Sequence, residues 1–311
     1  MINTNPVGTK LGGIMSKIII KLLSNLIPSK RIRHYIREYF GLKLNTEQLI
    51  EYSIQPFFLK KHSEKKLFAQ RLILGSSHAM RGLAEQDKEL NLGTSSQDLY
   101  YSYQLYKLFA PQMCNLKQVV LFFSVFSNGF NLGKCSEYCR CVPLKLFFGI
   151  PYENEKELKK KAVKAAEKQI KQNIQIISTQ ANTFQHDDNY IDMSSELVQY
   201  VAEKHKKHNK RQPHPLKYLK MLIEDSKKNG HTLIIVIPPY RNDYKSLLES
   251  SDILFAQINN IVQNNPHIRL LNFYDDVDFE SRDFLDCDHL KFSTGAKKLR
   301  NKLNKTDFAK L

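Results

Sequence analysis

Short apolar runs alternate with amphipathic stretches from residue 71 onward. The runs have the length of buried strands and are followed by polar or turn-forming residues: Arg71–Gly75, Glu89–Gly93, Val119–Phe123, Thr232–Ile237 and Ile268–Phe273. Between and after them, apolar positions recur at helical spacing, over residues 96–109 and again from Ser293 to Leu303. Strands that alternate with helices in this way predict an α/β fold, with a parallel sheet connected by crossover helices.

A long segment of different character interrupts this alternation. Residues 127–212 contain no apolar run of comparable strength; instead they carry a lysine-rich helical pattern over Glu153–Ile177 and a second basic stretch over Glu196–Arg211. We interpret residues 127–212 as a mainly helical, basic insertion. A predicted helix from Pro215 to Lys228 leads back to the sheet.

The N-terminal residues 1–60 are predicted to form a helical arm, and residues 61–311 the main domain. Apolar positions between Ile18 and Ile27 recur at helical spacing and are followed by basic residues. This stretch is too short to span a bilayer and lacks a signal-peptide cleavage pattern. A basic amphipathic helix of this kind can lie on an anionic membrane surface; packing on the domain or on a partner is the alternative.

The chain has 311 residues and a formal net charge of +16. Such a charge favours anionic partners, among them lipid, acidic polysaccharide and phosphate-bearing cofactors. The sequence matches no recognisable nucleic-acid module, P-loop or dinucleotide fingerprint, so we expect no nucleic-acid partner. The five cysteines are irregularly spaced, which is typical of a reducing compartment. These features predict a cytoplasmic protein, peripheral at the inner membrane if the N-terminal helix binds lipid.

Polar residues suited to acyl transfer follow the predicted strands. Ser76 and Ser77 follow the first strand, while Asp286, Asp288 and His289 follow the last. In open parallel sheets, ligands bind at the carboxyl ends of the strands. A serine hydroxyl becomes a nucleophile when an imidazole takes its proton, and the imidazole needs an acceptor that fixes its tautomer. We therefore predict Ser77, His289 and Asp286 as the catalytic residues, with Ser76 and Asp288 as the alternatives for the first and last roles.

The blocks Gly75-Ser-Ser77-His and Asp286-Cys-Asp-His289-Leu resemble those of the SGNH/GDSL superfamily of serine hydrolases and O-acyltransferases. The resemblance covers residues 70–130 and 215–305. It implies a three-layer α/β/α sandwich of the flavodoxin-like type, with a parallel sheet of about five strands. It also implies an oxyanion hole formed by the Ser77 amide, the Gly93 amide and the Asn128 side chain. Two departures are that Ser76 replaces the family's usual aspartate and that the Gly-x-Asn-Asp block is missing.

Two other groups of residues are candidates for binding. Tyr240 and Arg241 follow a Pro-Pro pair at the end of a predicted strand, and we expect them to contact substrate. The spacing of Cys135, Cys139 and Cys141 matches neither zinc-ribbon nor iron–sulfur patterns, so the sequence predicts no metal site.

The resemblance and the charge together predict a serine-dependent O-acyl transferase or esterase, with acetyl as the expected acyl group. The expected substrate is a carbohydrate, such as a bacterial capsule or other surface polysaccharide. No tightly bound cofactor is expected, and acetyl-CoA is the candidate acyl donor. Two alternatives are a non-catalytic glycan-binding protein on the same fold and a membrane-peripheral, lipase-like esterase. The intact Ser77, Asp286 and His289 argue against the first, and the cationic insertion argues against the second.

Overall fold

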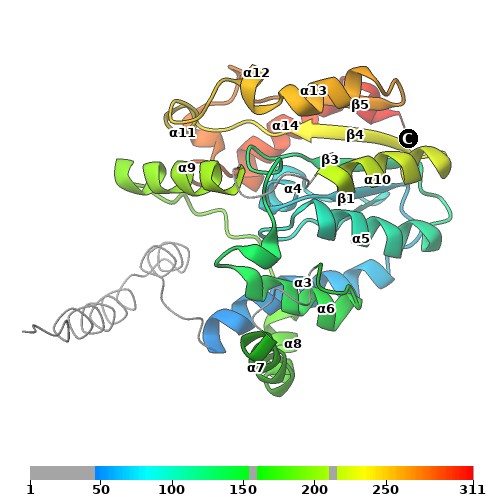
Figure 1. Ribbon diagram of the computed structural model, residues 1–311, viewed down its shortest axis with the longest axis vertical. Coiled ribbons are helices and arrows are strands. Elements are labelled where there is room, and N and C mark those ends of the chain that lie inside the picture. Colours follow the sequence, from blue (N-terminus) through cyan, green and yellow to red (C-terminus); the bar gives the residue numbers. More distant parts are fainter. Residues whose placement is uncertain (1–45, 154–159, 210–215, 311) are drawn as a thin grey trace, which may run out of the picture. The chain divides into compact units, whose positions relative to one another are not determined.

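The computed structural model describes residues 46–153, 160–209 and 216–310 (Figure 1). The chain divides into two compact units, Met1–Leu49 and Ile50–Leu311. The first unit is described only at the start of helix α3 (Thr46–Glu64), so the predicted membrane-binding helix lies outside the described residues. No helix in the described ranges is long and apolar enough to cross a membrane.

A five-stranded sheet forms the centre of the second unit. Its strands are β1 (Arg71–Leu74), β2 (Glu89–Asn91), β3 (Gln118–Phe122), β4 (Thr232–Ile237) and β5 (Ile268–Asn272). The order is β2-β1-β3-β4-β5, and every neighbouring pair is parallel. The chain places β2 on one side of β1, then crosses to the other side, where β3, β4 and β5 follow in order. This order is the flavodoxin-like arrangement, in which the ligand crevice opens at the carboxyl ends of the first and third strands.

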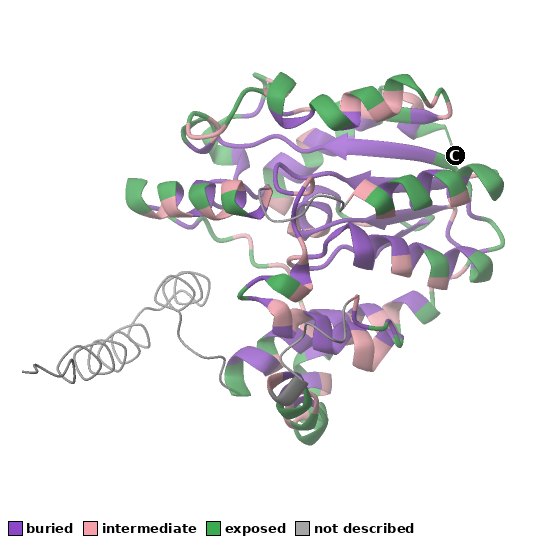
Figure 2. Cartoon of the chain, in the orientation of Figure 1, coloured by how far each residue is buried: buried purple, intermediate pink, exposed green. Residues whose placement is uncertain are grey.

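Helices cover both faces of the sheet, as Figure 1 shows. On one face, α5 (Leu99–Phe109) packs on β1 and α10 (Leu216–Lys228) on β4, and the two helices contact each other. On the other, alternate strand residues form an apolar core with α4 (Ser77–Gly82) and α14 (Lys297–Leu303). Strands β1 and β3 are buried along their length, and β4 is buried after its first residue (Figure 2). The edge strand β5 is partly exposed. The predicted three-layer α/β/α sandwich is confirmed.

The described part of residues 127–212 contains helices and turns but no strand. The helices are α6 (Cys141–Phe148), α7 (Lys160–Gln172), α8 (Ile174–Asn182) and α9 (Ser195–Asn209). The helix predicted over Glu153–Ile177 is divided at Asn173, where α7 ends and α8 begins. The remaining short helices, α11 (Asn242–Lys245), α12 (Ser251–Leu254) and α13 (Ala256–Gln263), lie between β4 and β5.

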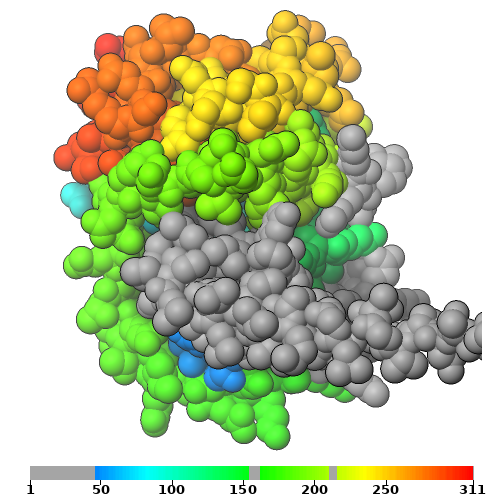
Figure 3. All heavy atoms as spheres, turned by 90° about the vertical axis from the view of Figure 1, so that its left-hand side faces the viewer, coloured from blue at the N-terminus to red at the C-terminus, as the bar shows by residue number. Residues whose placement is uncertain are grey.

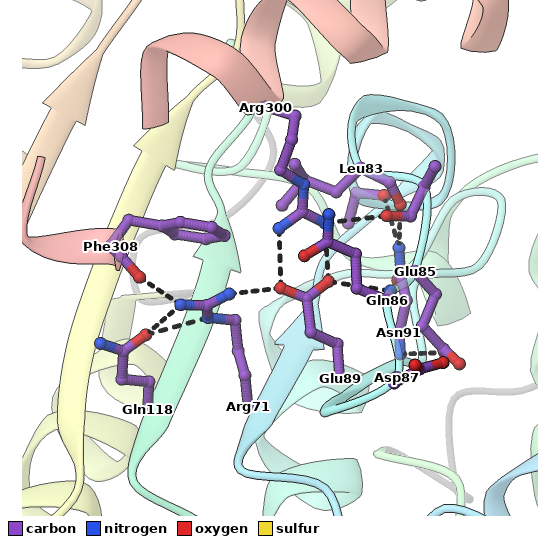
Figure 4. Close-up of polar contacts among 12 residues, drawn as sticks. Arg71, Leu83, Glu85, Gln86, Asp87, Glu89, Asn91, Gln118, Arg300 and Phe308 are labelled. Carbon is purple, nitrogen blue, oxygen red and sulfur yellow. Dashed lines mark hydrogen bonds and ion pairs between the residues drawn. The ribbon is translucent and has the colours of Figure 1, made fainter. Parts of the chain in front are cut away.

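A buried network of charged side chains joins the amino ends of three strands to α14 (Figure 4). Glu89 at the start of β2 accepts hydrogen bonds from Arg300 at 2.7 and 2.6 Å, and it pairs with Arg71 at the start of β1. Arg71 also donates to the Gln118 side chain at the start of β3, at 2.9 and 2.7 Å. Burial raises the pKa of Glu89, but Arg300 and Arg71 outweigh burial and hold this pKa below its usual value. The network therefore fixes this end of the sheet.

Replacing Glu89 with Gln should lower the free energy of unfolding by about 3–5 kcal/mol, because it leaves two buried guanidinium groups without their counter-charge. Urea denaturation followed by circular dichroism measures the change. The control is Asp307→Asn, which removes exposed ion pairs with Arg269 and Lys310 and should change stability little. Similar losses in both variants would show that the buried network does not hold this end of the sheet.

Candidate active site

Ser77 lies at the carboxyl end of β1, where the chain turns sharply into α4. Gly75 has a φ of +134°, which side-chain-bearing residues rarely adopt. A Cβ at this position would lie 2.9 Å from both the Cβ and the carbonyl oxygen of Phe122. The Ser76 side chain then caps α4 by accepting the backbone N–H of His78 at 3.4 Å. The turn leaves the Ser77 side chain partly exposed at the first position of the helix.

The structure brings Ser77, His289 and Asp286 together in a hydrogen-bonded relay. His289 Nε2 lies 2.7 Å from Ser77 Oγ, although the two residues are 212 positions apart. On the other side of the ring, His289 Nδ1 lies 3.0 and 3.1 Å from the two carboxylate oxygens of Asp286. A hydroxyl, an imidazole and a carboxylate in this order are the arrangement that activates a serine nucleophile.

A tight turn holds Asp286 and His289 in place. Asp286 Oδ1 accepts the backbone N–H of Asp288 at 3.1 Å and that of His289 at 2.8 Å. The Leu285 N–H closes the turn by donating to the His289 carbonyl at 2.7 Å. Aspartate side chains commonly bond backbone groups two or three residues ahead. The local spacing therefore determines both the turn and the approach of the carboxylate to the imidazole.

Two further buried side chains contact the base. Asp288 Oδ1 lies 2.9 Å from His289 Nδ1, and its Oδ2 lies 3.6 Å from His78 Nε2. The rings of His78 and His289 stack with their centroids 4.9 Å apart and their planes 11° apart. The sequence offers Asp288 only as an alternative to Asp286, and it gives no signal for His78 beyond its position next to Ser77.

Ser76, the alternative nucleophile, is directed elsewhere. Its Oγ lies 3.0 Å from Ser124 Oγ and 3.1 Å from His78 Nδ1, and the residue is buried. Ser77 is thus the serine of the pair that contacts the Nε2 atom of His289.

The predicted oxyanion-hole donors differ in their availability. The Ser77 amide is at the first position of a helix, where an N–H has no acceptor within the helix. The Gly93 amide instead donates to Asn91 Oδ1 at 2.9 Å, and a Cβ on Gly93 would lie 2.7 Å from the Met80 nitrogen. The Asn128 side-chain amide donates to the Leu254 carbonyl at 2.7 Å. In this structure the Gly93 N–H and one N–H of the Asn128 amide therefore have partners within loops, and the oxyanion-hole role of these two residues stays a prediction.

The two residues predicted to contact substrate are also held within the protein. Tyr240 is 3% exposed, and its hydroxyl accepts the Val125 N–H at 3.2 Å. Arg241 makes two hydrogen bonds of 2.7 Å to the Asp243 carboxylate, which neutralise its charge. Tyr240 therefore supports the site from inside the fold, because a side chain this deeply buried has no surface to offer a ligand.

A strap from the insertion, residues 184–193 between α8 and α9, crosses to the catalytic turn. Asp188 accepts the backbone N–H of Phe292 at 2.6 Å and that of Ser293 at 2.8 Å, across 104 and 105 residues. The Ile191 N–H donates to the Leu285 carbonyl at 2.7 Å. In the space-filling view of this side, green atoms of the insertion adjoin the orange and red C-terminal segment (Figure 3). The strap therefore fixes the insertion next to the relay.

Tyr190 of the strap and Lys291 form a partly exposed cationic–aromatic pair. Tyr190 is 48% exposed, and its hydroxyl accepts a hydrogen bond from Arg241 at 3.2 Å. The Lys291 ammonium lies 5.1 Å from the centre of its ring. Lys291 follows His289 by two residues, so the pair is attached directly to the catalytic turn. Tyr190 could not be predicted from the sequence, since neither its spacing nor its neighbours belong to a motif.

Two groups of side chains at the site have ligand atoms within 4.8 Å of one another: His78, Asp288 and His289, and Asp286, Cys287 and Asp288. A histidine binds a metal through a lone pair in its ring plane, and the lone pairs of two parallel stacked rings do not converge on one ion. Burial raises the pKa of the Cys287 thiol well above its usual value, which disfavours the thiolate that a metal requires. The geometry therefore favours proton transfer over metal binding. Cys135, Cys139 and Cys141 are buried in the insertion.

Searches of protein-family models and of curated proteins gave no match. Among solved structures, the chain is similar to a crystal structure from Bacteroides fragilis described as a "putative acylhydrolase". The sequence identity is 11% and the TM-score 0.41, and the match covers 80% of this chain and 93% of the other. This likeness is too distant to show a family or an activity.

Ser77→Ala should abolish labelling by a fluorophosphonate probe, because Ser77 is the partly exposed serine whose hydroxyl contacts the His289 base. His289→Ala should reduce labelling nearly as much, since the two side chains act as one unit. The matched control is Ser76→Ala, which removes the neighbouring hydroxyl and should leave most labelling intact. Gel fluorescence and intact-protein mass spectrometry measure the adduct. Retained labelling in Ser77→Ala with loss in Ser76→Ala would reverse the assignment.

Proposed function

We propose that this protein is a serine esterase or O-acyltransferase that works through an acyl-enzyme on Ser77. The observation that carries this proposal is the continuous relay from Ser77 Oγ through His289 to Asp286, with contacts of 2.7 and 3.0 Å. Ser77 Oγ attacks the acyl carbonyl while His289 Nε2 takes the hydroxyl proton. The tetrahedral intermediate collapses when His289 returns this proton to the departing oxygen or sulfur, which leaves the acyl group on Ser77.

The second half of the reaction uses the same atoms in reverse. His289 Nε2 takes a proton from the incoming hydroxyl, whose oxygen attacks the acyl-enzyme carbonyl. The bond to Ser77 Oγ then breaks, and His289 protonates this oxygen. The Ser77 amide is available to bind the negatively charged oxygen of each tetrahedral intermediate. Water as the attacking group gives hydrolysis, and a sugar hydroxyl gives transfer.

For the finer assignment we propose an O-acetyl group transferred to an anionic carbohydrate, with acetyl-CoA as donor. Two observations support an anionic sugar. Tyr190 presents a partly exposed aromatic face, which suits stacking against a sugar ring, and Lys291 adds a positive charge beside it. The chain as a whole also carries a net charge of +16, which attracts anionic partners at long range.

The proposal is tested by comparing acetyl transfer from acetyl-CoA to an acidic polysaccharide with hydrolysis of 4-nitrophenyl acetate. Lys291→Glu should raise the KM for the polysaccharide about tenfold, because it reverses the charge beside the acceptor. Its effect on the neutral ester should be small. The control is Lys228→Glu, the same charge reversal on an exposed residue at the far end of α10. Equal losses on both substrates in Lys291→Glu would contradict the anionic acceptor, and absence of any Ser77-dependent turnover would contradict the enzyme.

A further inference from the structure

A second histidine lies against the catalytic base, and the reaction steps above do not use it. His78 is buried, and its Nδ1 lies 2.8 Å from Ser124 Oγ and 3.1 Å from Ser76 Oγ. Its Nε2 has no hydrogen-bond partner among the described residues and faces Asp288 Oδ2 at 3.6 Å. The sequence places His78 beside the nucleophile, so the same turn that presents Ser77 also buries this ring.

The protonation state of His78 follows from its surroundings. Burial, together with the like charge of His289, lowers the pKa of His78 to about 3, so the ring is neutral at physiological pH. A neutral imidazole has one N–H and one acceptor nitrogen. The hydroxyl of Ser124 can donate to Nδ1, which places the hydrogen on Nε2. In this tautomer His78 directs its single N–H toward the Asp288 carboxylate.

Asp288 and Asp286 have different positions around His289. Asp286 Oδ1 is shared between the imidazole and two backbone N–H groups of the turn. Asp288 instead lies at the edges of the two stacked rings, with one oxygen 2.9 Å from His289 Nδ1 and the other 3.6 Å from His78 Nε2. Burial raises the pKa of Asp288, but the charge and hydrogen bond of His289 outweigh it and hold that pKa well below its usual value. A buried carboxylate therefore remains ionised beside the base.

We propose that His78 is a positioning residue, which holds Asp288 against His289 so that two carboxylates, rather than one, support the base. This inference rests on the proposed serine mechanism. A second buried negative charge stabilises the imidazolium that forms when His289 takes the serine proton. The stacked His78 can remain next to this cation because it is itself neutral.

Other titratable groups surround the stacked rings of His78 and His289. They come from the catalytic turn, from α9 and from the segment after β4: Asp286, Cys287, Asp288, His205, Tyr240 and Tyr244. Burial raises the pKa values of the two tyrosines and the thiol, so these groups stay protonated. Burial lowers the pKa of His205, so this ring stays neutral. The two carboxylates are therefore the charged groups that face the base from this set.

The test compares two amides at position 78. His78→Asn places its amide near the position of Nδ1 and cannot reach Asp288, whereas His78→Gln places an N–H near that of Nε2. The readout is the pH dependence of kcat/KM for a soluble acetyl ester. Asp288→Asn should lower kcat about tenfold and move the acid limb of the profile to lower pH, because His289 becomes a weaker base. His78→Asn should also lower kcat and move the acid limb to lower pH. His78→Gln should keep most of the wild-type kcat.

The double variant His78→Asn/Asp288→Asn decides whether His78 acts through Asp288. If it does, the double variant matches Asp288→Asn within about twofold, whereas independent effects multiply. Multiplying effects, or an acid limb that moves in none of the variants, would overturn the inference. Thermal unfolding of each variant shows whether it folds. If His78→Asn does not fold, the comparison of His78→Gln with Asp288→Asn still tests the inference. If Ser77→Ala retains full turnover, the proposed mechanism itself is wrong; if Ser77→Ala is inactive while the coupling is absent, only the role of His78 fails.

Discussion

The return of the C-terminal segment to the first strand is the constraint on which this structure depends. Two polar contacts secure it at opposite ends of the sheet. At the amino end, Arg300 of α14 binds Glu89, and at the carboxyl end His289 reaches Ser77. Because the nucleophile and its base are 212 residues apart, the relay exists only when the whole sheet is assembled. The charged network is thus separated from the relay in space, but both depend on the same return of the C-terminal segment to the sheet.

Much of the fold and the core of the relay could be predicted from the sequence, because local patterns determine them. The apolar run Thr232–Ile237 is β4 as predicted, and Ser77, Asp286 and His289 meet as their positions after strands suggest. The partners that the predicted oxyanion-hole donors have in the structure were not predicted from these patterns. The Gly93 N–H donates to the Asn91 side chain two residues earlier, a local contact that asparagine side chains commonly make in turns.

Contacts between distant segments account for the other differences. Asn128 is held by the Leu254 carbonyl 126 residues away, and no local pattern indicates this pairing. Tyr240 follows a strand as predicted, yet the position of a residue along the chain does not show which side of the loop its side chain occupies. The strap is similar: Asp188 belongs to a segment without a recognisable motif, and its role appears only where it meets Phe292 and Ser293.

The neutral, buried imidazoles of His78 and His205 link this site to the acidity of the solvent. On unfolding, each ring becomes exposed and recovers an ordinary pKa of about 6.5, whereas in the folded chain that of His78 is about 3 and that of His205 lies well below its usual value. The unfolded chain therefore binds more protons below about pH 6.5, and its free energy falls relative to the native state as the pH decreases through this range. Through these two rings, the packing that keeps the base in place makes unfolding a proton-consuming reaction in mild acid.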